Sequence, residues 1–143
     1  MVDKTYMAPF VLATFKSPRP DAKTVIFYQY YDTMAADNDQ KWSSDFFTLI
    51  ERDGYLYARG VDDDKGHIIA RLTAVMSYLS QYKEAPLKLV FMMEGTEESA
   101  SVDLEKYLAK YVTDFQGADL LIWEQGIRNE QDQLELIGGI KRF

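Results

Sequence analysis

The chain has 143 residues, of which 47% are hydrophobic and 27% are charged, with a formal net charge of -7 and no cysteine. A single domain of this size buries roughly two-thirds of its unfolded surface, so it needs no disulfides to hold a core. The acidic balance argues against a nucleic-acid partner, because affinity for a polyanion comes mainly from Lys and Arg side chains that neutralise phosphates.

Neither a membrane span nor a secretory signal is expected. No apolar stretch approaches the length needed to cross a bilayer. Residues 7–13 form the longest apolar stretch near the start, but they include a proline, lack a basic leader and are soon followed by Lys16, unlike the apolar part of a signal peptide. We therefore expect a cytoplasmic protein with no membrane partner.

The first half of the chain predicts strands and one hairpin. Strands are expected at residues 10–15 and 24–31, separated by the turn-forming sequence Ser-Pro-Arg-Pro-Asp-Ala. Residues 47–50 and 55–57 then flank Asp53-Gly54, a dipeptide that favours positive φ in a two-residue turn. A β-hairpin is therefore expected there.

The clearest helix is expected over residues 64–83, where Gly60 and Gly66 allow a tight entry. Its apolar residues recur at helical spacing. They are Ile68, Ile69, Leu72, Val75, Met76 and Leu79. Residues 87–93 follow as a near-continuous apolar run, which is typical of a strand covered on both faces.

The remaining elements complete an alternating α/β pattern. Leu104, Tyr107, Leu108 and Tyr111 mark a second helix, residues 118–123 predict another buried strand, and residues 134–137 a final strand. The order strand, helix, strand, helix, strand predicts right-handed crossovers and a largely parallel core sheet, with the hairpin and the final strand at its margins.

Acidic residues lie just past the ends of separate apolar runs. They are Asp32, Asp63, Glu97, Glu98 and Glu124. Ligands of an open α/β sheet bind beyond the carboxyl ends of its strands, so these loops are expected to converge. Several carboxylates at close range repel one another unless a cation or a proton lies among them. The pattern therefore predicts a metal site built from carboxylates.

Structural interpretations of the same residues stay open on the sequence. The runs 62–64 and 97–98 precede helices, where carboxylates cap free amides and interact favourably with the helix dipole. Capping does not explain why Glu124 follows a buried strand. The only histidine, His67, is expected to be a surface or capping residue rather than a ligand. The tyrosines of residues 28–31 are expected in the core rather than in a binding wall.

Six segments match one family pattern in order and at similar separations. They are Tyr-Asp at 31–32, Trp-Ser-Ser-Asp-Phe-Phe at 42–47, Asp-Gly-Tyr-Leu-Tyr-Ala-Arg-Gly at 53–60, Asp-Asp-Lys-Gly at 63–66, Glu-Gly-Thr-Glu-Glu-Ser at 94–99 and Asp-Leu-Leu-Ile-Trp-Glu at 119–124. They resemble the di-zinc metallopeptidase family of carnosinases, aminoacylases, acetylornithine deacetylases and glutamate carboxypeptidases, and look closest to its dipeptidase-like bacterial members.

The resemblance implies an α/β three-layer sandwich with a mixed, largely parallel sheet. Residues 1–143 would form an incomplete catalytic domain, without the family's lid or dimerisation domain and without the C-terminal part of the catalytic domain. The parent enzyme would act on a small peptide or an N-acyl amino acid.

The resemblance also implies a role for each acidic residue. Asp63 would bridge two zinc ions, and Glu97 would be the general base. Glu98 would ligate one zinc ion and Glu124 the other, while Asp32 matches a carboxylate that orients a histidine ligand. Zinc lowers the pKa of its bound water and polarises the scissile carbonyl, and a nearby carboxylate passes the proton to the leaving amine.

The chain departs from the family at both nitrogen ligands. Where the family has His-x-Asp, this sequence has Tyr30-Tyr31-Asp32. A phenol with a reference pKa of about 10 is a poor zinc ligand, so Tyr30 would bind only if the metal itself drove its deprotonation. The family's other histidine lies far downstream of the region matched here. We therefore expect weak or absent zinc binding, with Mn²⁺ or Mg²⁺ as alternatives.

Three functions follow as hypotheses. The first is a fragment of a di-zinc hydrolase of peptide or N-acyl amide bonds, impaired in catalysis as it stands and forming a homo-oligomer through an uncovered sheet edge from residue 133 onward. The second is a non-catalytic module with a protein-interaction role. The third is a magnesium-dependent phosphatase with Asp32 as its nucleophile, although Met34 stands where such enzymes have a second Asp.

Overall fold

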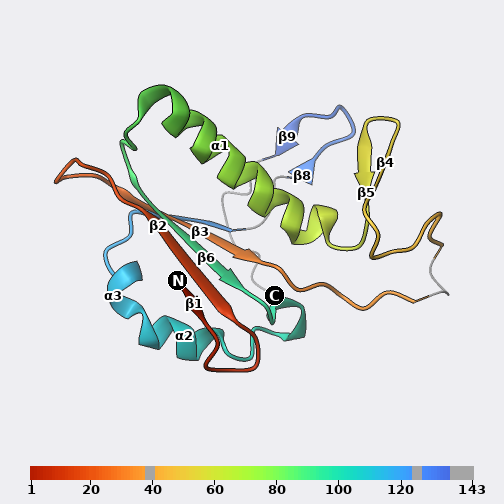
Figure 1. The fold of residues 1–143 in the computed structure, drawn as a ribbon, viewed down its shortest axis with the longest axis horizontal. Coiled ribbons are helices and arrows are strands. Elements are labelled where there is room, and N and C mark those ends of the chain that lie inside the picture. The colour runs from red at the N-terminus through yellow and green to blue at the C-terminus, as the bar shows by residue number, and fades with distance from the viewer. Residues whose placement is uncertain (38–40, 124–126, 136–143) are drawn as a thin grey trace.

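The computed structural model describes residues 1–37, 41–123 and 127–135. A five-stranded sheet with the order β1-β2-β6-β3-β7 lies at its centre (Figure 1). Its strands are β1 (Val2–Asp3), β2 (Phe10–Phe15), β3 (Thr24–Tyr30), β6 (Lys88–Glu94) and β7 (Leu120–Trp123). β3 runs parallel to β6 and β7, whereas β2 is antiparallel to β1 and β6. The predicted α/β fold with a mixed sheet is confirmed.

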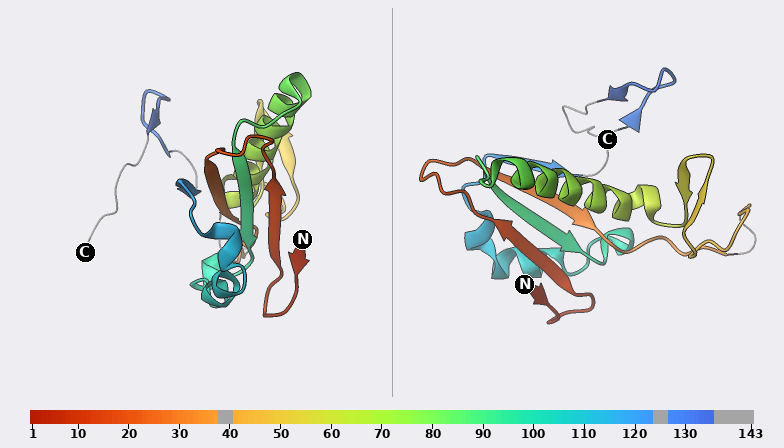
Figure 2. Two further views of the ribbon diagram at one scale, coloured as in Figure 1. Left: turned by 90° about the vertical axis from the view of Figure 1, so that its left-hand side faces the viewer. Right: turned by 45° about the horizontal axis from the view of Figure 1, so that its top comes forward.

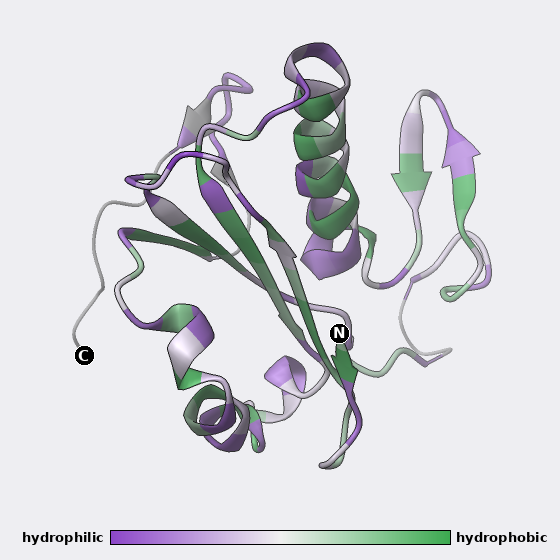
Figure 3. Ribbon diagram, turned by 60° about the vertical axis from the view of Figure 1, so that its left-hand side comes forward, coloured by the Kyte–Doolittle hydropathy of each residue, from purple (hydrophilic) through white to green (hydrophobic). Residues whose placement is uncertain are grey.

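Helices cover both faces of the sheet (Figure 2). α1 (Gly66–Tyr82) packs on one face, and α2 (Leu104–Lys110) with α3 (Val112–Phe115) on the other. The central strands are apolar along most of their length (Figure 3). Because successive side chains of a strand point to opposite faces, the same strands supply two cores.

The two cores follow this alternation. The core beneath α2 contains Phe10, Leu12, Ile26, Tyr28, Val90, Met92 and Tyr107. The core beneath α1 contains Ile68, Phe91 and Met93, with partly buried neighbours that include Phe27, Tyr31 and Leu72. The near-continuous apolar run of β6 is therefore explained by burial on both faces, as its sequence predicts.

The predicted hairpin forms, but outside the main sheet. β4 (Ile50–Arg52) and β5 (Tyr55–Tyr57) pair with each other as a separate two-stranded sheet. Asp53 and Gly54 have φ values of 54° and 79°, the positive values that the tight turn requires. The expectation that this hairpin borders the main sheet is wrong.

Three other sequence expectations need correction. The second helix ends at Lys110, and α3 begins after a break at Tyr111. β9 (Leu134–Glu135) pairs with β8 (Ile127–Arg128) in a third small sheet instead of bordering the main one, and residues 136 and 137 of the predicted strand lie outside the described residues. β7 was expected to be buried but is an edge strand with exposed side chains.

The described part of the chain contains no helix that is both long enough and apolar enough to cross a membrane.

β7 generates a prediction about self-association. Among the described strands it pairs only with β3, and the exposed fractions of Leu120, Leu121 and Trp123 are 53%, 51% and 54%. An apolar edge strand with unpaired amides is a template for another chain. We predict that the protein forms dimers or larger oligomers, measured by light scattering over a range of concentrations. Leu121→Lys should shift the population toward monomer, and a monomer at high concentration in the unmodified chain would contradict the prediction.

Candidate functional site

The carboxyl ends of β3 and β6 define the site. In their parallel register Tyr30 lies opposite Glu94, so the loops that follow both strands leave the sheet at the same edge. A third segment joins them there, the helical turn η1 (Val61–Lys65), which contacts β3 and leads directly into α1. The convergence that the sequence predicts is therefore present for the loops that carry Asp32, Asp63 and the 97–98 pair.

Tyr30 links β3 to η1 through two hydrogen bonds. Its ring is buried, with 3% exposed, and its hydroxyl donates to Oδ1 of Asp63. Its backbone N–H lies 3.4 Å from Oδ2 of Asp64, which is fully buried. Burial raises the pKa of Asp64, and the Tyr30 amide and the Arg71 charge oppose that rise. Tyr30 thus stabilises the acidic turn with two hydrogen-bond donors, its hydroxyl and its backbone N–H.

Lys65 and Gly60 complete the contact between η1 and β3. The Lys65 Nζ donates to the carbonyl of Tyr31 at 3.1 Å, so it bridges the two segments instead of pairing with neighbouring aspartates. Gly60 has φ 82°, and a Cβ there would lie 2.4 Å from both the Lys65 Nζ and the Thr33 Cγ2. A side chain at position 60 would therefore displace this contact.

Asp32 orients the turn that carries the paired glutamates. Its Oδ2 accepts the backbone N–H of Glu98 at 3.0 Å. Its Oδ1 is buried and has no hydrogen-bond partner among the described residues. Glu97 and Glu98 belong to η2 (Glu97–Ser99), a single 3₁₀ turn in which both side chains are partly exposed. Asp32 and Glu98 are thus brought together, by a side chain to backbone contact.

Neither acidic run caps a helix through a side-chain hydrogen bond, although each run lies in the first turn of its own short helix, η1 or η2. α1 begins at Gly66 without a hydrogen bond from a capping side chain. The 97–98 pair forms its own turn, and α2 begins only at Leu104, after Asp103. His67 is partly exposed, with Nε2 3.9 Å from the exposed Asp62 carboxylate, which agrees with a surface residue rather than a ligand.

Among the tyrosines of residues 28–31, Tyr28 and Tyr30 are core residues as expected, whereas Tyr31 is only partly buried beside the core beneath α1. Tyr28 and Tyr30 are buried, with 7% and 3% exposed, and both hydroxyls donate to carboxylates. Burial, followed by the hydrogen bond to Glu94, raises the pKa of the Tyr28 phenol. Neither ring is positioned as the wall of an open binding pocket.

The described residues do not fit a pair of zinc ions. No group of three or more His, Cys, Asp or Glu side chains in the described ranges is arranged to hold a metal ion. Oδ1 of Asp63, the expected bridging ligand, accepts the Tyr30 hydroxyl, and one Asp32 oxygen is used by the Glu98 amide. Glu124, expected as a ligand, lies outside the described residues.

Sequence reasoning missed one residue of this site, Glu94. It is the last residue of β6, is 2% exposed, and accepts hydrogen bonds from the hydroxyls of Tyr28, Thr96 and Ser101. The available signal was a charged residue at the end of an otherwise apolar run, heading the Glu-Gly-Thr-Glu-Glu-Ser segment.

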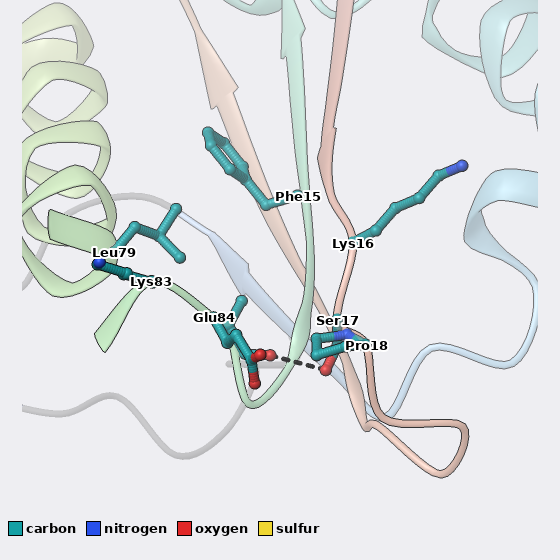
Figure 4. A pocket seen from close by; sticks show the side chains of 8 residues that line it. Phe15, Lys16, Ser17, Pro18, Leu79, Lys83 and Glu84 are labelled. Atoms are coloured by element: carbon teal, nitrogen blue, oxygen red, sulfur yellow. Dashed lines mark hydrogen bonds between the residues drawn. The ribbon is translucent and has the colours of Figure 1, made fainter. Parts of the chain in front are cut away.

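A cavity lies at the end of the sheet opposite to the acidic loops. It has a volume of about 450 Å³ and lies between the end of β2 and the end of α1, where Phe15, Ser17, Leu79 and Lys83 contribute to its wall (Figure 4). The Ser17 hydroxyl donates to the Ala85 carbonyl at 2.7 Å and closes one side. No acidic residue of the candidate site lines this cavity.

Comparison with known proteins places residues 26–136 in the sequence pattern of peptidase family M20/M25/M40. Human Beta-Ala-His dipeptidase is 36% identical over 115 residues, which are 80% of this chain and 22% of that protein. The Cys-Gly metallodipeptidase DUG1 of Saccharomyces cerevisiae is 34% identical over 116 residues, 79% of this chain and 24% of that protein.

A solved structure shows the same arrangement. The M20 family metallo-carboxypeptidase Sso-CP2 from Sulfolobus solfataricus superposes with a TM-score of 0.80 at 31% identity, over 93% of this chain and 30% of that one. The chain therefore spans about a fifth to a third of the length of these relatives.

The contact between Tyr30 and Asp63 can be tested by stability. Tyr30→Phe removes the hydroxyl but keeps the buried ring, so we predict a loss of about 1.5–3 kcal/mol in the free energy of unfolding, as expected for a hydrogen bond to a charged group. Urea denaturation measures the loss. Tyr55→Phe, at a ring that is 69% exposed, should change stability little. Equal effects in the two variants would contradict the structural role of this hydroxyl.

Proposed function

The chain belongs to peptidase family M20/M25/M40, and from this membership we propose that it carries part of a site for hydrolysis of peptide or N-acyl amide bonds. The proposal assigns Glu97 as general base, Asp63, Glu98 and Glu124 as metal ligands, and Asp32 as the carboxylate that orients residue 30. Similarity to proteins named as dipeptidases supports small peptides as the substrate class.

We further propose that the chain, as it stands, does not turn over these substrates. The observation that carries this part is the hydrogen bond from the Tyr30 hydroxyl to Asp63. The phenol donates a hydrogen bond to the carboxylate that would hold the metal, whereas a neutral imidazole would offer the metal a lone pair. The acidic residues of the site then have a hydroxyl, not a nitrogen ligand, as their neighbour on β3.

A non-catalytic role is the second candidate, and the exposed edge of β7 favours it. Leu120, Leu121 and Trp123 present apolar surface beside an edge that no described strand pairs with. Such an edge suits association with another protein or another copy of the chain. Under this proposal the acidic loops keep their geometry for fold stability alone.

Metal preference is the first test of the proposal. A site left with oxygen ligands should bind Mg²⁺, Mn²⁺ or Ca²⁺ weakly, and zinc should lose the advantage that nitrogen ligands give it. Calorimetry at neutral pH measures these affinities. Tight zinc binding that disappears in Asp63→Asn would contradict the role given to Tyr30.

The Tyr30→His variant tests whether a nitrogen ligand at residue 30 restores zinc binding. Oδ1 of Asp32, which has no partner among the described residues, could accept an imidazole N–H. We expect zinc affinity to rise by about tenfold or more, since loss of even an orienting partner of a zinc ligand costs about 10–100-fold. Tyr30→Phe is the matched control and should bring no increase. If His and Phe behave alike, residue 30 does not correspond to the ligand position.

Activity is the direct test. We predict no measurable hydrolysis of a panel of dipeptides and N-acyl amino acids by the unmodified protein with added Zn²⁺ or Mn²⁺. General base catalysis needs an activated water within hydrogen-bond reach, and the described ligand set does not fix one. Glu97→Ala is assayed beside it. Turnover by the unmodified protein that Glu97→Ala abolishes would show that the site is competent.

A further inference from the structure

Glu94 is a buried carboxylate that the proposed reaction does not use. It ends β6 and heads the loop that carries the 97–98 pair, and only 2% of the residue is exposed. A carboxylate removed from water destabilises the fold unless donors replace its hydration. The described residues supply these donors as hydroxyls and include no cationic hydrogen-bond partner for it.

The three hydroxyls come from separate places in the fold. Oε1 of Glu94 accepts the Tyr28 hydroxyl, from β3, and the Ser101 hydroxyl at 2.8 Å. Oε2 accepts the Thr96 hydroxyl at 2.9 Å. Thr96 precedes η2 and Ser101 follows it. One carboxylate therefore holds both ends of the 96–101 loop and ties them to the neighbouring strand.

The loop depends on this closure because its backbone is not a regular helix. Ser101 N–H donates to the Thr96 carbonyl at 2.7 Å, and Ala100 N–H to the Glu97 carbonyl at 3.0 Å. Ala100 and Ser101 both have positive φ, 67° and 50°, which is unfavourable for residues other than glycine. Closing contacts at the loop ends must compensate for this backbone conformation.

Gly95 lets the loop lie against β3. The residue after Glu94 packs on the Tyr31 ring, and a Cβ there would lie 2.4 Å from the ring. The Tyr31 N–H also donates to the Glu94 carbonyl at 3.0 Å. The main chain and the carboxylate of Glu94 thus both attach the loop to β3 and to the residue that follows it, and a side chain at position 95 would have to displace the Tyr31 ring.

We propose that Glu94 is a positioning residue: its carboxylate gathers the hydroxyls of Tyr28, Thr96 and Ser101 and so fixes the turn that presents Glu97 and Glu98 to the site. The Glu98 amide is kept on Asp32 as a consequence. The inference rests on the proposed function only in the chemical role given to the two glutamates. The fixation of the turn is a property of the fold.

Amide hydrogen exchange followed by NMR tests the proposal without metal or substrate. In Glu94→Gln one acceptor oxygen becomes a donor, and the three hydroxyls can no longer all be accepted. We expect exchange of the Glu98 amide to accelerate by about tenfold or more, which corresponds to loss of one net hydrogen bond of ordinary strength. The Val90 amide in the middle of β6 should change no more than global stability does.

Asp3→Asn is the matched control. Asp3 is also a buried carboxylate, 8% exposed, and accepts from Thr5, Lys110 and Tyr111, none of which belongs to the 96–101 loop. Its loss should lower stability without a selective effect on Glu98. If Glu94→Gln and Asp3→Asn accelerate the Glu98 amide equally, or Glu94→Gln leaves it unchanged, Glu94 does not position the turn.

Ser101→Ala gives a milder second variant that removes one hydroxyl and keeps the carboxylate. Selective acceleration at Glu98, smaller than in Glu94→Gln, supports the proposal, and no acceleration at all contradicts the part assigned to Ser101. Mn²⁺ titration of the unmodified protein is run in parallel. Failure to bind Mn²⁺ would count against the proposed metal site, whereas an unchanged Glu98 amide in Glu94→Gln counts against the positioning role, so the two failures are distinguishable.

Discussion

The parallel pairing of β3 with β6 is the constraint on which the site depends. The register places Tyr30 opposite Glu94, and each strand ends at that point. Both strands are buried on two faces, so a slip of one residue would exchange the side chains that face α1 with those that face α2. The positions of the acidic loops are therefore determined by packing in the sheet before any ligand or loop contact contributes.

Two tyrosines of β3 attach the acidic loops to the sheet by hydrogen bonds. Tyr28 donates to Glu94 and Tyr30 to Asp63, so alternate residues of one strand each hold a carboxylate from a different segment. Hydroxyl donors satisfy these carboxylates without adding positive charge. Crowded carboxylates in a metal site are stabilised by a cation, but here two of the acidic side chains already have neutral partners. These hydrogen bonds explain how the loops are held in place without a metal ion. Among the described residues, no three His, Cys, Asp or Glu side chains are grouped so that they could hold one.

Much of the fold could be predicted from the sequence because its signals are local. The Asp53-Gly54 turn follows from backbone preference, and α1 follows from apolar spacing. The exposure of β7 could not be predicted in this way. An apolar run shows that a strand can be covered, but not whether another element covers it. The break at Tyr111 was hidden because its ring continues the helical apolar pattern of α2 while its backbone leaves the helix.

The sequence places Asp32 and the 97–98 pair at one sheet edge because strand ends set that edge, and the structure brings them together there. The role of Asp32 in orienting residue 30 stays a prediction, whereas the hydrogen bond from the Glu98 amide to Asp32 was not foreseen. Glu94 was overlooked because a charged residue at a strand end is usually interpreted as solvated. Its buried carboxylate is instead satisfied by three hydroxyls, from Tyr28 on a neighbouring strand and from Thr96 and Ser101 in the loop after β6. Hydrogen-bond partners of this kind depend on three-dimensional contacts that residue spacing does not encode.

Oδ1 of Asp32, the oxygen that does not accept the Glu98 amide, is buried beside Tyr30's strand end without a hydrogen-bond donor among the described residues. A buried acceptor without a partner destabilises a fold by about 1–3 kcal/mol, so such atoms are uncommon in protein interiors. Oδ1 of Asp32 has no partner among the described residues, while residue 30, two positions earlier, directs its hydroxyl to Asp63. The resemblance predicts a histidine at position 30, whose N–H this carboxylate would orient. Tyrosine has no second donor on its ring, so it can satisfy Asp63 or Asp32 but not both. With the Tyr30 hydroxyl directed to Asp63, Oδ1 of Asp32 is left without a donor among the described residues.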